Sequence, residues 1–160
     1  MEAVTIPATT AMLVLRLLLA TGLGMAIGLN RELRRKPAGL RTHALVALGS
    51  ALFTLVGLAL TQFDAGRDPS AVGRIAQGLI AGVGFIGGGV ILRREDPKGV
   101  HGLSTAASIW IVAAAGVACG CGLWRSAVAT VLIALLLLVG GGIIDRALHT
   151  RGPGDDDPTL

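Results

Sequence analysis

Residues 44–63 read ALVALGSALFTLVGLALTQF, twenty consecutive positions without a charged side chain. A helix of this length rises about 30 Å, which matches the hydrocarbon thickness of a bilayer. In lipid, every backbone N–H and C=O group needs a partner within the protein, and this run lacks the alternation typical of a barrel strand. We therefore predict that residues 44–63 form a transmembrane helix.

Four further apolar runs of similar length share the chain with it. The hydrophobic fraction is 52% and the charged fraction only 15%, whereas soluble domains carry about 25% charge. The mean hydropathy is +0.72. We predict an all-α membrane protein, with a bundle of five transmembrane helices in residues 1–150 and a disordered cytoplasmic tail in residues 151–160. The other four predicted spans are residues 11–29, 71–92, 100–118 and 126–144.

Lysine and arginine are unequally divided between the connectors of these spans. Ten lie in the first and third connectors and after the fifth span, against two in the second and fourth connectors. Because cytoplasmic loops carry the excess of positive charge, this predicts an N-terminus outside and a C-terminus in the cytoplasm. The first span lacks the features of a removable signal peptide and is expected to be retained. The chain is thus expected to be a multi-pass protein of the bacterial inner membrane.

The positive net charge and the absence of catalytic and nucleotide-binding motifs exclude several classes of function. Net charge +4 follows from topology and attraction to anionic lipid, so the bilayer is the expected partner and nucleic acid is not. No span has a carboxylate at its middle, and the sequence has no HExxH pair and no nucleotide motif. Cys119 and Cys121 are too few for a soft-metal site and are interpreted as turn residues. We expect neither enzymatic activity nor a bound metal or cofactor.

Glycine is abundant, with 24 residues, and recurs at the four-residue spacing that lets membrane helices approach closely. The densest run, Gly78–Gly89, predicts that the third span is the structural centre. Two interpretations are open for it: tight packing within the chain or between subunits of a homo-oligomer, or a broken helix that lines a solute path. The pairs with this spacing are Gly24/Gly28, Gly78/Gly82, Gly84/Gly88 and Gly116/Gly120.

Polar residues inside spans are costly unless they are paired or hydrated. Arg16 and Arg74 lie near the predicted outer face, where each could extend to water or, for Arg74 with Gln77, contribute to a vestibule. His101, Ser104, Thr105 and Ser108 form a helical stripe near the cytoplasmic end, although such hydroxyls often bond their own helix. Glu32 stands among five bases and is either neutralised there or holds the first connector in place.

Three blocks of sequence resemble the MgtC/SapB family of bacterial inner-membrane proteins. They are GLNRELRRKPAGLRTHALVALGSALFTLV from Gly28, RIAQGLIAGVGFIGGGVILR from Arg74 and VHGLSTAASIWIVAAAGVACG from Val100, in the family's order and covering about half of the chain. The resemblance marks as candidate functional residues Glu32, Gly39, Arg41, Thr42, Arg74, Gln77, Gly78, Gly84, Gly87, His101, Gly102, Ser104 and Thr105.

This resemblance implies five spans and a non-catalytic role in adaptation to low magnesium or in virulence. Members of the family are thought to bind the F-type ATP synthase and to adjust membrane potential. Long members continue into a soluble cytoplasmic domain, whereas this sequence ends ten residues after position 150. The alternative function is a small ion or solute transporter, with Mg²⁺ as one possible substrate. Convergence of Arg74, Gln77 and Thr105 on one cavity would favour that alternative.

Overall fold

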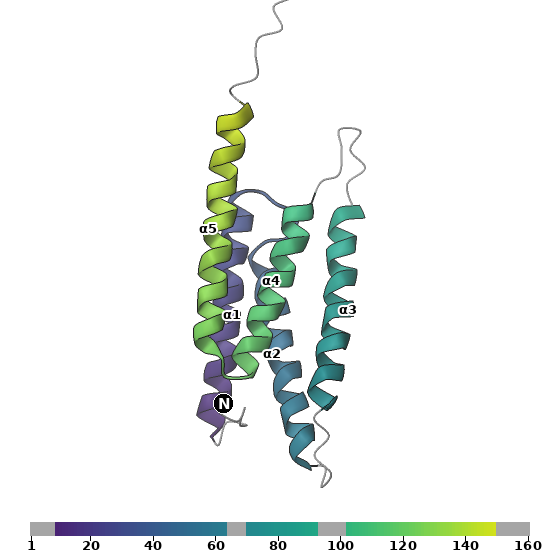
Figure 1. Cartoon of the computed structure of the whole chain (residues 1–160). Coiled ribbons are helices and arrows are strands. Elements are labelled where there is room, and N and C mark those ends of the chain that lie inside the picture. Colours follow the sequence, from purple (N-terminus) through teal and green to yellow (C-terminus); the bar gives the residue numbers. More distant parts are fainter. Residues whose placement is uncertain (1–8, 64–69, 93–101, 150–160) are drawn as a thin grey trace, which may run out of the picture.

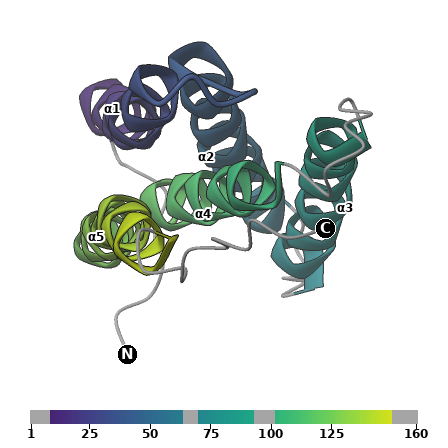
Figure 2. The same cartoon turned by 90° about the horizontal axis from the view of Figure 1, so that it is seen from above.

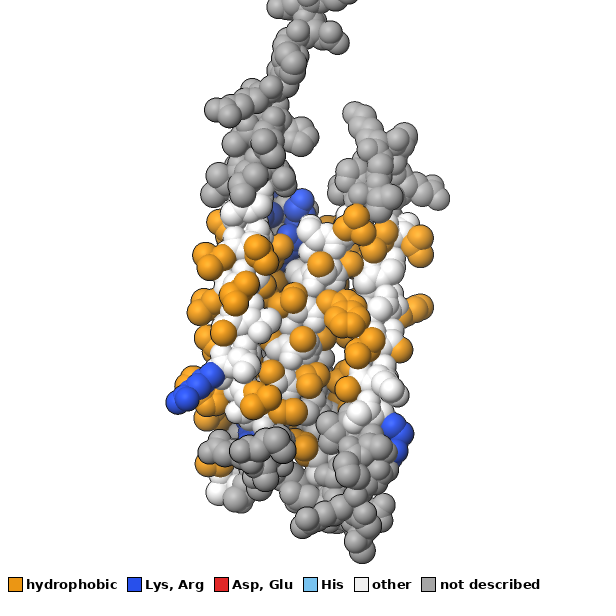
Figure 3. Space-filling model, in the orientation of Figure 1, with side chains coloured by type: hydrophobic (Ala, Val, Ile, Leu, Met, Phe, Trp, Pro, Cys, Tyr) orange, Lys and Arg blue, Asp and Glu red, His pale blue; other side chains and the backbone are white. Residues whose placement is uncertain are grey.

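A computed structural model of the chain describes residues 9–63, 70–92 and 102–149, and all of their regular structure is helical. All five helices are long and apolar enough to cross a membrane. The visible face is largely hydrophobic, and its few Lys and Arg side chains lie toward the upper and lower parts (Figure 3). The predicted all-α, five-helix architecture is therefore confirmed. The helices are α1 (Thr10–Leu33), α2 (Leu40–Phe63), α3 (Ser70–Leu92), α4 (Leu103–Gly120) and α5 (Trp124–His149) (Figure 1).

The connector between the first two helices is shorter than predicted. We expected it over residues 30–43, but α1 continues to Leu33 and α2 begins at Leu40. Helix α1 then stops where Arg35 takes a positive φ of 51°. The N–H groups of Arg35 and Lys36 return to the carbonyls of Glu32 and Arg31, at 2.9 and 3.0 Å, which closes the helix end. Hydropathy marks the border of the lipid, not the last hydrogen-bonded turn, so the prediction missed these residues.

Helix α4 is the centre of the bundle. It contacts the other four helices, whereas α3 contacts only α2 and α4. Half of the α4 span is buried, against 11% of the α3 span. Seen from above, α3 and α5 lie on opposite sides of α4 (Figure 2). The prediction that the glycine-rich third span is the structural centre is therefore wrong.

Glycines of α1 and α4 make the close contacts, and both sets face α2. A Cβ added at Gly24 would lie 2.6 Å from the His43 carbonyl oxygen, and one at Gly120 would lie 2.7 Å from Thr54 Cβ. Gly116 is closer still to the Ala47 carbonyl. Helices without side chains at these points pack backbone to backbone, which is the chief source of helix association in lipid. The packing interpretation is confirmed for Gly24/Gly28 and Gly116/Gly120.

The α3 glycines behave differently. Gly78, Gly82, Gly84 and Gly88 have no neighbouring atom within 4 Å of an added Cβ. Their spacing therefore has no packing partner in the part of the chain that the structure describes. The face of α3 that carries Gly78 and Gly82 is therefore not covered by any described residue.

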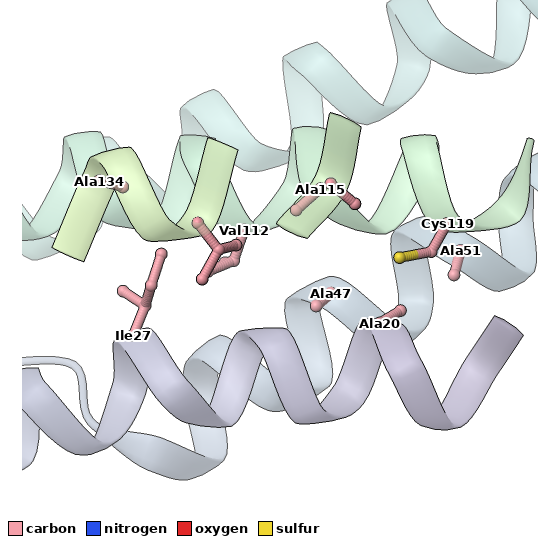
Figure 4. Close-up of a cluster of buried hydrophobic side chains, with 10 residues drawn as sticks. Ala20, Ile27, Ala47, Ala51, Val112, Ala115, Cys119 and Ala134 are labelled. Carbon is pink, nitrogen blue, oxygen red and sulfur yellow. The ribbon is translucent and has the colours of Figure 1, made fainter. Parts of the chain in front are cut away.

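The main core consists mostly of small side chains, which suits the short distances between helices. Ala20 and Ile27 of α1 lie opposite Val112 and Cys119 of α4, with Ala47 beside them (Figure 4). Every fully buried alanine here brings two backbones closer than a leucine would allow.

Cys119, Cys121 and Arg16 lie at the end of the bundle where α4 stops at Gly120. Cys119 and Cys121 are free, and burial raises the pKa of the Cys121 thiol, which favours its protonated form. Arg16 Nη1 donates to the Gly120 carbonyl at 2.8 Å, so this guanidinium satisfies the C-terminal end of α4.

Candidate functional site

Buried polar side chains gather where the end of α1 meets the starts of α2 and α4, at the upper end of the bundle in Figure 1. Arg31 comes from the last turn of α1, His43 from the first turn of α2, and Thr105 and Ser108 from the first two turns of α4. All four are buried. In a chain of this hydropathy such a cluster is costly, and its members must satisfy one another.

Arg31 is the charged member, and only 2% of its surface is exposed. Its Nη2 donates to Thr105 Oγ1 at 2.7 Å and to Ser104 Oγ at 3.0 Å. Its Nε is buried and has no hydrogen-bond partner. The Oδ1 atom of the preceding residue, Asn30, is also buried without a partner. Both partners of the guanidinium are neutral hydroxyls, so its charge is not balanced by a carboxylate within the described residues.

His43 joins α2 to α4 through its Nε2 and bonds the residue before α2 through its Nδ1. Nδ1 lies 2.8 Å from the Gly39 carbonyl oxygen, and Nε2 lies 2.9 Å from Ser108 Oγ. The carbonyl can only accept, so Nδ1 carries a proton. Ser108 has a single proton, and the Thr105 carbonyl at 2.8 Å competes for it. When Ser108 donates to Nε2, the ring is the neutral tautomer that carries its proton on Nδ1.

Glu32 connects the two helices that border the short connector. Its Oε2 accepts a hydrogen bond from the Leu40 backbone N–H at 2.7 Å, which satisfies one of the orphan donors at the start of α2. A Cβ at Gly39 would lie 2.6 Å from the same oxygen. Glu32 and Gly39 therefore act together, and any side chain at position 39 would displace the carboxylate.

Gly102 and Gly87 set the approach of α3 to α4. Gly102 precedes α4 with a φ of 94°, and an added Cβ would lie 2.9 Å from the Val90 carbonyl oxygen. Position 102 thus requires glycine both for its backbone angle and for space. At Gly87 an added Cβ would meet Ala106 Cβ at 3.5 Å, an ordinary contact.

The remaining predicted residues lie elsewhere. Arg41 is exposed and Thr42 half-buried on the first turn of α2, and His101 falls outside the described residues. Arg74, Gln77, Gly78 and Gly84 are exposed on α3. Because α3 and α4 run in opposite directions (Figure 1), Arg74 and Thr105 are separated by nearly the length of α3, about 25 Å. The three side chains that would have marked a solute path do not converge.

Arg31 and His43 were not among the candidate residues from the sequence, whereas Ser108 was noted as part of the polar stripe of the fourth span. We counted Arg31 as a loop charge, but it is buried at the end of a helix. One signal was present: Gly24, Gly28 and Arg31 are spaced by four and three residues, so they share one face of α1. Because that face packs against α2, Arg31 at its end is buried as well.

A second feature lies along the middle of the bundle, between α2 and α3. It is an apolar groove of about 570 Å³, bordered by Leu45, Gly49 and Phe53 of α2 and by Ile75, Gly78 and Gly82 of α3. The glycines leave the groove wide because no side chain projects into it from those positions. As for metal binding, no three His, Cys, Asp or Glu side chains of the described ranges cluster together.

Comparison with known proteins identifies the family of this chain. The model of the MgtC family matches residues 17–147, which include all five helices. The chain belongs to the MgtC family. The resemblance found in the sequence is thereby confirmed, and the protein is a multi-pass bacterial membrane protein. No solved structure matches the chain.

Relatives in three bacteria share this family region. The chain is 47% identical over 143 residues to SrpB of Synechococcus elongatus, covering 85% of this chain and 78% of SrpB. It is 43% identical over 122 residues to MgtC of Salmonella typhimurium, covering 76% of this chain and 49% of MgtC. It is 45% identical over 134 residues to YhiD of Escherichia coli, covering 81% of this chain and 60% of YhiD. The match thus spans about half of the Salmonella relative's length.

Proposed function

We propose that this protein is a non-catalytic membrane protein that binds another membrane complex through the α2–α3 groove and thereby modulates it. The partner that the family suggests is the F-type ATP synthase, and the physiological setting is adaptation to low magnesium. The observation that carries the proposal is the unfilled groove itself, where two glycines of α3 face space that no part of the described chain occupies.

The contrast among the glycines supports this interpretation. On α1 and α4, glycines at the same four-residue spacing are covered by the backbone of α2. On α3 the equivalent pair, Gly78 and Gly82, borders the groove and has no neighbour within 4 Å. In lipid, helices associate through such small-residue faces, because the backbones come close enough for extensive van der Waals contact. The groove therefore suits a transmembrane helix of a partner.

The lining favours a protein partner over a water-soluble substrate. Among the described residues that line the groove, Ser50 is the one polar side chain; the others are aliphatic, aromatic or glycine, and none is ionisable. A soluble ligand needs several convergent polar groups for its orientation. A lipid-embedded helix needs shape and apolar contact, which this surface supplies.

The magnesium setting comes from the relatives. One of them carries the name "Putative magnesium transporter YhiD" and another the name MgtC. Direct transport is the second candidate function for that reason. It requires a polar route through the bundle, and the wide separation of Arg74 from Thr105 gives no support to such a route. Modulation of a partner complex needs no such route, so we place it first.

Filling the groove tests the proposal. Gly82→Ile adds a branched side chain to the groove wall, at a position where the fold leaves room for it. We expect co-purification with ATP synthase subunits from bacterial membranes to fall roughly tenfold, because overfilling a packed contact costs about 1–3 kcal/mol. The yield of the folded protein should stay at the wild-type level.

Gly88→Ile is the matched control on the same helix. At about 100° per residue, position 88 lies about 120° around α3 from position 82 and away from the groove. An added Cβ there also meets nothing within 4 Å. Co-purification should be unchanged in this variant. Equal recovery of ATP synthase subunits with both variants would exclude the groove as the contact surface.

A further inference from the structure

We propose that Arg31, together with the Thr105 and Ser104 hydroxyls and the first turn of α4, binds an oxyanion of the phosphate type. This site lies at the end of the bundle that the charge distribution assigns to the cytoplasm. It is separate from the α2–α3 groove, and the inference does not depend on the proposed docking function.

The first argument is the charge of Arg31. A guanidinium that is 2% exposed has lost most of its hydration, and such a charge needs an anionic partner or a large set of hydrogen bonds. Glu32, the adjacent carboxylate in sequence, is exposed and accepts the Leu40 N–H. His43 and Ser108 bring no negative charge. Within the described chain the cation therefore lacks a counter-charge.

The second argument is the number of free donors. A guanidinium has five N–H groups, and the two recorded bonds of Arg31 both leave from Nη2. Its Nε is buried without a partner. Gly102, before α4, supplies no side chain to cap the helix. The Thr105 N–H donates to the Gly102 carbonyl at 2.9 Å, which leaves the N–H groups of Leu103 and Ser104 open to a ligand. A helix N-terminus beside a buried arginine is a favourable place for an anion.

The third argument is access. Ser104 shares Nη2 with Thr105, and its side chain is exposed, so one of the two hydroxyls bound to Arg31 faces the surface. An oxyanion with several oxygens can accept from the guanidinium fork, a hydroxyl and a backbone N–H at once, which a single chloride cannot. Two sources supply this chemistry at the membrane surface: the phosphodiester of an anionic phospholipid, and free phosphate in the cytoplasm.

Thermal unfolding of the full chain in nanodiscs tests the inference in two arms. In the first arm, discs of phosphatidylcholine receive inorganic phosphate or chloride at equal ionic strength. In the second arm, phosphatidylglycerol replaces part of the phosphatidylcholine. A ligand that binds only the folded protein raises the unfolding midpoint in a saturable way. We expect such a rise in at least one arm, and the arm in which it occurs identifies the source.

Variants decide whether the rise depends on this site. Arg31→Gln should weaken the ligand at least about tenfold, since a hydrogen bond to a charged group is worth about 1.5–3 kcal/mol. Arg31→Lys keeps the charge without the fork and should give an intermediate loss. Lys36→Gln removes an exposed cation of the connector between α1 and α2 and should leave the rise unchanged, which separates the site from general surface charge.

Two further measurements keep the inference open to refutation. If Arg31→Gln fails to fold, Ser104→Ala replaces it, because position 104 is exposed and tolerates the change. Equilibrium dialysis of labelled phosphate against the wild type and Arg31→Lys then measures binding without unfolding. No rise in either arm, or an equal rise in wild type and every position-31 or position-104 variant, would overturn the inference.

Discussion

Gly116→Ala is expected to lower the free energy of unfolding by about 2–3 kcal/mol, the cost of overpacking a closely packed contact. The new Cβ would collide with the Ala47 carbonyl oxygen and would lie 2.9 Å from Ser50 Cβ. Both atoms belong to α2, and the carbonyl is backbone, so neither can turn aside as a flexible side chain would. The two central helices would have to separate, and their other contacts would weaken with them.

Reversible unfolding in detergent micelles measures this effect, with Gly22→Ala as its matched control. Gly22 is exposed on α1, and an added Cβ there meets nothing within 4 Å. Alanine favours helix over glycine by at most about 1 kcal/mol, so Gly22→Ala should be neutral or slightly stabilising. If both substitutions have the same effect, the close packing of α4 on α2 does not stabilise the bundle.

Thr105→Val is expected to destabilise the protein by about 2 kcal/mol although it preserves side-chain shape, because a hydrogen bond to a charged group is lost. Thr105 is fully buried, and its Oγ1 is the nearer of the two acceptors of Arg31. Valine fills the same volume and has the same branching, so core packing stays intact. What changes is the solvation of the guanidinium, which water reaches poorly.

Ser104→Ala separates burial from hydrogen bonding. Ser104 also accepts from Arg31 Nη2, at 3.0 Å, but its side chain is exposed. Water can replace its hydroxyl, so the loss should stay below about 0.5 kcal/mol, as for most surface substitutions. The same unfolding assay compares the two. A larger effect of Ser104→Ala than of Thr105→Val would show that Arg31 is stabilised from the solvent side.

The architecture was predictable because lipid leaves few choices. A run such as residues 44–63 can only be a spanning helix, and five runs define the bundle without knowledge of packing. Which helix lies at the centre of the bundle and which at its edge was not predictable. Glycine density singled out the third span, yet a small-residue face reports only that something packs there. Whether that neighbour belongs to the same chain depends on the other helices.

The candidate site was predictable in part. The hydroxyls of Ser104 and Thr105 and the carboxylate of Glu32 stood out by their residue types. Arg31 did not, since it stands in a basic stretch, and charge alone assigned it to a loop. Its burial follows from its phase on α1, one turn after Gly28, together with the continuation of the helix to Leu33. The Arg31–Thr105 contact crosses 74 positions of sequence, a separation at which helical periodicity carries no information.

Photo-crosslinking from the groove tests the proposed docking most directly. A benzophenone amino acid at Phe53, a groove residue that is 58% exposed, should crosslink in native membranes to a subunit of the F-type ATP synthase. The same probe at Leu136 of α5, 73% exposed and across α4 from the groove, should give no such product. Absence of ATP synthase from the Phe53 adducts, or equal adducts from both positions, would contradict docking through the α2–α3 groove.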